Sequence, residues 1–237
     1  MKTGGGSDAA KRHAGESAAK TVDDGDVVGL GTGSTAAHAI RRLGDRIDAG
    51  LDVRGVATSF ASRELAVDQG IPLVGLVEAV GPDAPGIDVA IDGADQVAVG
   101  DGPSALIKGG GAAHAREKLV DAAADRLLIV ADHTKEIVML DRAVPVEMLP
   151  DGRSVVAEAV RAAGGEPTLR RAKRKDGPVV TDNGNLVLDC AFGPIPEPEP
   201  LAATLAGIPG VVEHGLFVGL TDAVHVGTAN SVRVREP

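Results

Sequence analysis

The chain has 237 residues, which is enough for one large domain or two modest ones with a hydrophobic core. Its 34 acidic residues outnumber its 24 Lys and Arg, and the net charge of −10 argues against nucleic acid as a main partner. A single cysteine forms no internal disulfide, and no apolar run approaches the ~18 residues of a membrane span. We therefore expect a soluble, cytoplasmic protein, with the acidic composition that is typical of a salt-loaded cytoplasm.

Helices alternate with short apolar strands along the first 131 residues. A helix is expected at 7–22, where Ser7 or Asp8 can cap an Ala- and Lys-rich segment. The strand-like runs that follow are 27–30, 53–57, 72–76, 87–91, 105–107 and 127–131, and the helical segments are 36–43, 59–69 and 112–124. This alternation predicts an α/β fold with a Rossmann-like, mostly parallel sheet and helices on both faces.

The elements become shorter from about residue 141. Strand-like runs, a helix at 154–163 and a hairpin-like turn at Asp182-Asn183-Gly184 predict a smaller α+β (ferredoxin-like) domain. Short runs at 216–220 and 224–226 are compatible with strands that return to the first sheet. We therefore assign 1–140 and 212–237 to the Rossmann-like domain and 141–211 to the small domain.

A glycine-rich loop at 31–35 lies between a strand and a helix. Its backbone amides and the helix N-terminus would form an anion site, and its hydroxyls suit a lone phosphate. A nucleotide-hydrolysing P-loop is disfavoured because Gly33 stands where that motif needs Lys. A dinucleotide site is disfavoured because the next strand ends at 57–59 without the acidic residue that binds ribose. A tight turn without a ligand remains the alternative.

Two carboxylates, Asp92 and Asp95, directly follow another apolar strand. Open α/β sheets bind ligands at the carboxyl ends of their strands, and carboxylates suit sugar hydroxyls. The structural alternative is an Asp-Gly turn with a helix cap.

A third polar cluster starts at Lys108, which is followed by three consecutive glycines and a helix. Glycines at this place indicate close approach of the backbone to another group. Glu117 in the helix can reach back toward the loop and serve as a base, although a solvated glutamate is the alternative. Lys135, after the next strand, could meet an anion or be an ordinary surface lysine. The six histidines show no metal-ligand spacing, so we expect no metal.

These polar clusters, taken in order with later segments at 145–147, 181–185 and 208–217, resemble the type A ribose-5-phosphate isomerases. The resemblance covers nearly the whole chain. It implies an aldose-ketose isomerase that interconverts D-ribose 5-phosphate and D-ribulose 5-phosphate through an enediolate, without a cofactor, in the non-oxidative pentose phosphate pathway. It also implies a homodimer or homotetramer.

The resemblance further implies a role for each cluster. Glu117 would move a proton between carbons 2 and 1, Asp92 would assist ring opening, and Lys108 would stabilise the developing oxyanion. The implied substrate-binding residues are Lys11, Thr32, Gly33, Ser34, Thr35, Asp92, Gly93, Ala94, Asp95, Lys108, Gly109, Gly110, Gly111 and Lys135.

Three other functions compete with this interpretation. A non-catalytic sugar-phosphate sensor would have the same fold, but such modules usually carry a DNA-binding helix-turn-helix with a basic patch, which this chain lacks. A coenzyme A transferase would use a glutamate nucleophile and would need the loop at 32–35 to hold a much larger cofactor. A dinucleotide-dependent reductase is disfavoured by the missing ribose-binding acid.

Overall fold

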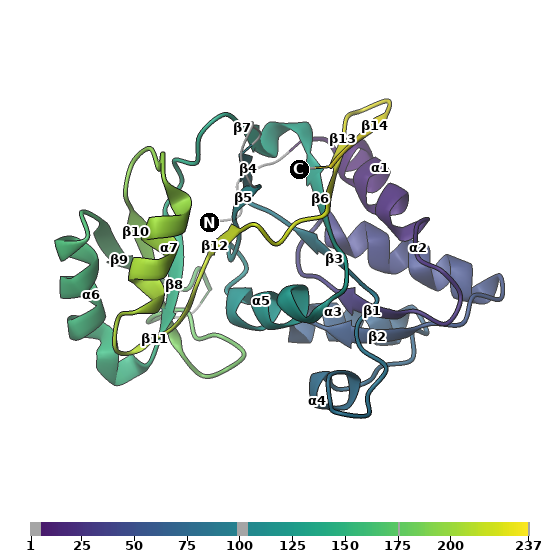
Figure 1. Ribbon diagram of the computed structural model, residues 1–237, viewed down its shortest axis with the longest axis horizontal. Coiled ribbons are helices and arrows are strands. Elements are labelled where there is room, and N and C mark those ends of the chain that lie inside the picture. Colours follow the sequence, from purple (N-terminus) through teal and green to yellow (C-terminus); the bar gives the residue numbers. More distant parts are fainter. Residues whose placement is uncertain (1–5, 99–103, 175, 237) are drawn as a thin grey trace. The chain divides into compact units, whose positions relative to one another are not determined.

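The computed structural model describes residues 6–98, 104–174 and 176–236 (Figure 1). They form two compact units. The six-stranded unit contains 6–94, 116–136 and 220–236, and the antiparallel unit contains 95–98, 104–115, 137–174 and 176–219. Within these described ranges, no helix is both long enough and apolar enough to cross a membrane.

The six-stranded unit is built on one sheet with the strand order β14-β13-β6-β3-β1-β2. Its strands are β1 (Val27–Leu30), β2 (Arg54–Ala57), β3 (Val89–Gly93), β6 (Leu127–Asp132), β13 (Ala223–Gly227) and β14 (Val232–Arg235). All neighbours are parallel except β14, which pairs antiparallel with β13 at the edge. The central strands are almost wholly buried, as apolar runs in a sheet covered on both faces must be.

Helices cover both faces of this sheet. They are α1 (Asp8–Ala19), α2 (Ala36–Asp48), α3 (Phe60–Asp68), α4 (Leu76–Ala79) and α5 (His114–Ala123), whose residues from 116 onward belong to this unit. Because side chains alternate along a strand, Val28 packs in the core with α1 and α2, whereas Val27 packs in a second core with Val120 of α5. The predicted Rossmann-like arrangement is therefore confirmed.

The antiparallel unit contains two four-stranded sheets. One has the order β11-β8-β10-β9 and the other the order β12-β5-β4-β7. The strands are β4 (Gln96–Ala98), β5 (Ala105–Ile107), β7 (Glu136–Ile137), β8 (Val144–Met148), β9 (Glu166–Leu169), β10 (Leu186–Ala191), β11 (Val211–His214) and β12 (Leu216–Val218). The helices of this unit are α6 (Arg153–Ala162) and α7 (Pro198–Ala206), and the short 3-10 turn η2 (Pro150–Gly152) precedes α6. A second 3-10 turn, η1 (His133–Lys135), belongs to the six-stranded unit.

The first of these sheets confirms the predicted ferredoxin-like domain. Its elements follow in the order β8-α6-β9-β10-α7-β11, which is the βαββαβ pattern of that fold. Glu147 on β8 is fully buried, and its Oε1 accepts hydrogen bonds from Thr181 Oγ1 (2.9 Å), Asn183 Nδ2 (3.0 Å) and Asn185 Nδ2 (2.8 Å). This network explains why polar residues cluster in the 181–185 segment.

Three strand predictions for the parallel sheet were wrong. The run 105–107 forms β5, which pairs antiparallel with β4 and with β12 and not with the parallel strands. The run 216–220 does not return to the first sheet, because its strand, β12, is the other neighbour of β5. At 72–76 the structure has only an isolated bridge between Gly55 and Leu73, and α4 begins at Leu76. Such short apolar runs do not encode which sheet they join.

Candidate active site

Several predicted site residues of the six-stranded unit gather at one edge of its sheet. Strands β1, β3 and β6 are parallel neighbours, so the segments that follow them lie at a common edge (Figure 1). These segments are the loop 31–35 after β1, Asp92 to Ala94 at the end of β3, and η1 with Lys135 after β6. We call this set the edge cluster.

Asp92 fixes the backbone of the edge cluster. Its side chain is fully buried, and its Oδ1 accepts hydrogen bonds from the backbone amides of Thr32 (2.9 Å) and Gly93 (2.6 Å). The two segments approach so closely that a Cβ at Gly31 would lie 2.3 Å from Asp92 Oδ1. Only glycine fits at position 31, and the loop conformation therefore depends on Asp92.

The hydroxyl groups of the loop point to different partners. Thr32 Oγ1 lies 2.8 Å from Thr58 Oγ1 and donates to Ser59 Oγ at 2.7 Å, so Thr32 is tied to the segment after β2. Ser34 is exposed, and Thr35 stands at the N-cap of α2 without a capping hydrogen bond from its side chain. The hydroxyls of Ser34 and Thr35, together with the N-terminus of α2, therefore form the part of the loop best suited to an anion. In the sequence, Thr58 and Ser59 stand out only because the acidic residue that binds ribose in a dinucleotide site is absent there.

The two lysines of this unit that the sequence analysis singled out, Lys11 and Lys135, differ in their surroundings. Lys135 ends η1 and is half-buried next to Asp132, the last residue of β6. Burial alone would raise the pKa of Asp132, but hydrogen bonds from Thr134 and from the backbone of Gly6, with the charge of Lys135, lower it. Asp132 therefore stays ionised and holds the turn that carries Lys135. Lys11 lies in the first turn of α1 and is half-buried.

Glu117 lies in the first turn of α5 and is only 3% exposed, so it is not the solvated surface glutamate of the alternative interpretation. The preceding residue, Arg116, donates from Nε to the carbonyl oxygen of Ala57 at 2.9 Å and so anchors α5 to the end of β2. One turn after Glu117, Asp121 is also buried. A carboxylate at position 117 is thus held on a fixed helix and shielded from bulk water.

The remaining predicted residues belong to the antiparallel unit. Lys108 follows β5 and is 1% exposed, and its backbone amide donates to the carbonyl oxygen of Gly215 at 2.9 Å. The Lys108 Nζ lies 5.1 Å from the ring centroid of Phe217 on β12, which is within cation-π distance. A Cβ at Gly215 would lie 2.3 Å from the Lys108 carbonyl oxygen, so this contact also requires glycine. Neither partner could be inferred from the sequence around Lys108.

The segment 109–112, which we call the glycine loop, has an unusual backbone. Gly109 has φ +96°, and Ala112 with φ +61° is the one non-glycine residue with positive φ in the described part of the chain. The amide of Gly110 donates to Asp95 Oδ2 at 2.7 Å, and the amide of Ala112 donates to the Gly109 carbonyl at 3.0 Å. Strained residues of this kind concentrate at functional sites. Because the Gly110 amide donates to Asp95, the amides of Gly109 and Gly111 are the remaining candidates in this loop for hydrogen bonds to a ligand.

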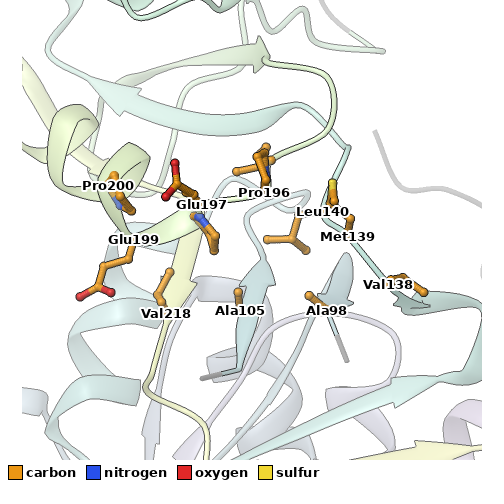
Figure 2. A pocket seen from close by; sticks show the side chains of 12 residues that line it. Ala98, Ala105, Val138, Met139, Leu140, Pro196, Glu197, Glu199, Pro200 and Val218 are labelled. Atoms are coloured by element: carbon orange, nitrogen blue, oxygen red, sulfur yellow. The ribbon is translucent and has the colours of Figure 1, made fainter. Parts of the chain in front are cut away.

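The antiparallel unit also has an apolar pocket of about 460 Å³ (Figure 2). Its lining includes Met139, Leu140 and Val218, and the charged residues Glu197 and Glu199 also contribute to it. None of the predicted site residues lines this pocket. Within the described residues, no group of three or more His, Cys, Asp or Glu is arranged to hold a metal ion.

Comparisons with known proteins point to one family. The family model described as Ribose 5-phosphate isomerase A (phosphoriboisomerase A) matches residues 54–231. A relative from Halorubrum lacusprofundi named ribose-5-phosphate isomerase A is 78% identical over 237 residues, which is 99% of each chain.

Two solved structures have similar folds. The ribose 5-phosphate isomerase A of Methanocaldococcus jannaschii is 42% identical with a TM-score of 0.89, and the match covers 96% of this chain and 98% of that one. A D-ribose-5-phosphate isomerase in complex with phospho-erythronic acid is 37% identical with a TM-score of 0.89, covering 96% and 97% of the two chains.

Proposed function

Because the chain belongs to the ribose 5-phosphate isomerase A family, we propose that it interconverts D-ribose 5-phosphate and D-ribulose 5-phosphate with Glu117 as the base. The observation that carries this proposal is the 78% identity to a ribose-5-phosphate isomerase A over essentially the whole chain. The structural support is a buried glutamate on a fixed helix and a loop that presents the hydroxyls of Ser34 and Thr35 at the N-terminus of another helix.

The reaction requires a base and a partner for the charge that it creates. Glu117 removes the proton from carbon 2 of the open-chain aldose, and the electron pair forms an enediolate whose negative charge develops on the carbonyl oxygen. Lys108 and the amides of Gly109 and Gly111 stabilise this oxygen, a role that is typically worth about 2.7–4 kcal/mol per donor. Glu117 then returns the proton to carbon 1, while the hydroxyl proton of carbon 2 moves to the oxygen on carbon 1. No cofactor takes part.

The edge cluster, together with Lys11 and Asp95, binds the rest of the substrate. Gly33, Ser34, Thr35 and the N-terminus of α2 hold the phosphate, and Lys135 and Lys11 add positive charge. Thr32 braces this loop through Thr58 and Ser59. The segment from Asp92 to Asp95 holds sugar hydroxyls and assists ring opening.

The protein works in the cytoplasm, in the non-oxidative pentose phosphate pathway, as a homodimer or homotetramer. Residues 1–140 and 212–237 form the catalytic domain and 141–211 the small domain in this proposal. The location, the pathway, the oligomeric state and the domain boundaries stay predictions. Cell fractionation tests the location, solution mass measurement tests the oligomeric state, and limited proteolysis tests the domain boundaries.

The decisive experiment follows ketose formation from ribose 5-phosphate with a chelator present, in low and in molar KCl. We expect turnover by the wild type and a loss of about 100- to 10,000-fold in Glu117→Gln, because general bases contribute that much. Glu64→Gln, the same change at an exposed helical position, is the matched control and should keep full activity. Binding of ribose 5-phosphate by the wild type without turnover at any salt concentration would instead make the chain a sugar-phosphate sensor.

A further inference from the structure

The peptide group between Gly109 and Gly110 is held at both of its ends. Its carbonyl oxygen, on Gly109, accepts a hydrogen bond from Arg170 Nη1 at 2.8 Å. Its N–H, on Gly110, donates to Asp95 Oδ2 at 2.7 Å. The peptide group and its two partners, Arg170 and Asp95, belong to the antiparallel unit, although Arg170 lies 61 residues beyond Gly109 in the chain.

This peptide group needs external restraint because glycine stands on both sides of it. Glycine populates positive and negative φ about equally, so the peptide plane between two glycines can rotate at little steric cost. Such a rotation would turn the Gly109 oxygen away from Arg170 and the Gly110 amide away from Asp95 at the same time. The two hydrogen bonds therefore select one orientation of the loop that follows Lys108.

Arg170 is itself rigidly placed. It follows β9, and its backbone amide donates to the Val187 oxygen at 2.9 Å. Its side chain is 9% exposed, and Nε donates to Asp189 Oδ2 at 3.0 Å while Nη2 also pairs with the same carboxylate. This bidentate contact fixes the plane of the guanidinium group. Nη1 therefore points at the Gly109 oxygen without further loss of side-chain freedom.

From these contacts we infer that Arg170 is a positioning residue for the isomerase site, an inference that rests on the proposed function. Arg170 acts through the Gly109–Gly110 peptide and sets both the amides of the glycine loop and the carboxylate of Asp95. A cation on the peptide oxygen also polarises the peptide, which makes the Gly110 N–H a stronger donor to Asp95.

The kinetic signature of this role is a fall in kcat. The oxyanion is absent from the bound substrate and develops only in the transition state and the enediolate, so a misplaced donor lowers kcat and changes KM little. We expect Arg170→Met to lower kcat on the order of 100-fold, as for a misplacement of about 1 Å, with KM for ribose 5-phosphate within about threefold of the wild type. Arg170→Lys, which can still donate to the Gly109 oxygen, should recover part of the lost rate.

Two control variants separate positioning from stability. Arg171→Met removes the same charge from the exposed neighbouring residue and should leave kcat unchanged. Asp189→Asn removes the ion pair but keeps an acceptor for Arg170, so it should lower Tm like Arg170→Met while keeping most of kcat. If Arg170→Met and Asp189→Asn lost kcat only in proportion to their loss of Tm, Arg170 would be a structural residue and the inference would be wrong.

A measurement independent of activity completes the test. Hydrogen exchange of the Gly110 amide, followed by NMR on the full chain, should be slow in the wild type and in Arg171→Met. It should be at least about tenfold faster in Arg170→Met, because one of the two restraints on the peptide is gone. Unchanged Gly110 exchange in Arg170→Met overturns the inference whatever the kinetics show. An inactive wild type with this exchange pattern overturns the proposed function instead.

Discussion

Two buried side chains, Lys108 and Cys190, lie in settings that determine their chemistry. Lys108, at 1% exposure, lies over the Phe217 ring, whose negative face offsets part of the cost of removing an ammonium from water. Cys190 on β10 is also fully buried but lies in an apolar core among Val146, Met148 and Leu188. Burial, with the charge of the neighbouring Asp189, raises the pKa of the Cys190 thiol to about 12.

The raised pKa predicts that Cys190 is unreactive in the folded protein, because the thiolate and not the thiol is the nucleophile. Iodoacetamide at pH 8 should leave the native chain unlabelled for hours and should label it completely in concentrated urea, as mass spectrometry would record. Rapid labelling of the native chain would mean that this core opens readily.

The residue types at the strand ends could be predicted from the sequence, but their partners could not. Asp92, Lys108 and Glu117 stand out in the sequence because each is a charge at the end of an apolar run or in the helix that follows, the place where open α/β sheets bind ligands. The structure places Lys108 after the antiparallel strand β5 instead. The residues that hold these groups are distant in the chain, as the contact between Gly109 and Arg170 shows. A local pattern carries no information about which distant donor reaches a given carbonyl.

At the scale of elements, α1 is joined to the sheet by a partly buried polar contact. His225 on β13 is 3% exposed, and its Nδ1 lies 2.9 Å from Ser17 Oγ on α1. Burial lowers the pKa of His225 from its ordinary value of 6.5, so the ring is neutral in the folded protein at pH values where the unfolded chain is already protonated.

This contact predicts a pH-dependent loss of stability. As the pH falls below 6.5, the unfolded state binds a proton that the folded state does not, and the free energy of unfolding decreases until the pH passes the lowered folded pKa. His225→Gln should remove this part of the pH dependence, by up to about 1.4 kcal/mol per pH unit, in urea unfolding curves between pH 7 and 5. His133→Gln, at an exposed position, is the control and should follow the wild type. If the free energy of unfolding changed equally with pH in the wild type and in His225→Gln, the account would be wrong.

Element type was more predictable than sheet membership. Helix α6 begins and ends within one residue of the predicted 154–163, because its amphipathic pattern extends over several turns. Strand β5 has three residues, and its apolar pattern is the same in a parallel and in an antiparallel sheet. Its place beside β4 and β12 follows from long-range pairing, which three residues do not encode.

At the scale of the whole molecule, the net charge of −10 is a source of self-repulsion that opposes the compact state. The acidic composition also fits the halophilic relatives of this chain. Dissolved salt shortens the Debye length from about 30 Å at 0.01 M to about 3 Å at 1 M and so weakens this repulsion.

We therefore expect Tm to rise as KCl is increased from 0.01 to 1 M in thermal unfolding scans. A variant in which several exposed acidic residues, such as Asp45, Glu158 and Asp182, are changed to Asn or Gln should not show a rise in Tm of similar size. A Tm of the wild type that is independent of KCl would show that the surface charge does not limit stability.

The central claim is that Glu117 transfers the proton between carbons 2 and 1 through an enediolate. The most direct measurement runs the isomerisation of ribose 5-phosphate in D2O and follows the carbon-bound hydrogens by NMR. The account predicts that the wild type introduces deuterium at these carbons, and that Glu117→Gln introduces essentially none while it still binds ribose 5-phosphate. Deuterium uptake by Glu117→Gln at the wild-type rate would contradict the account and assign the proton transfer to another group.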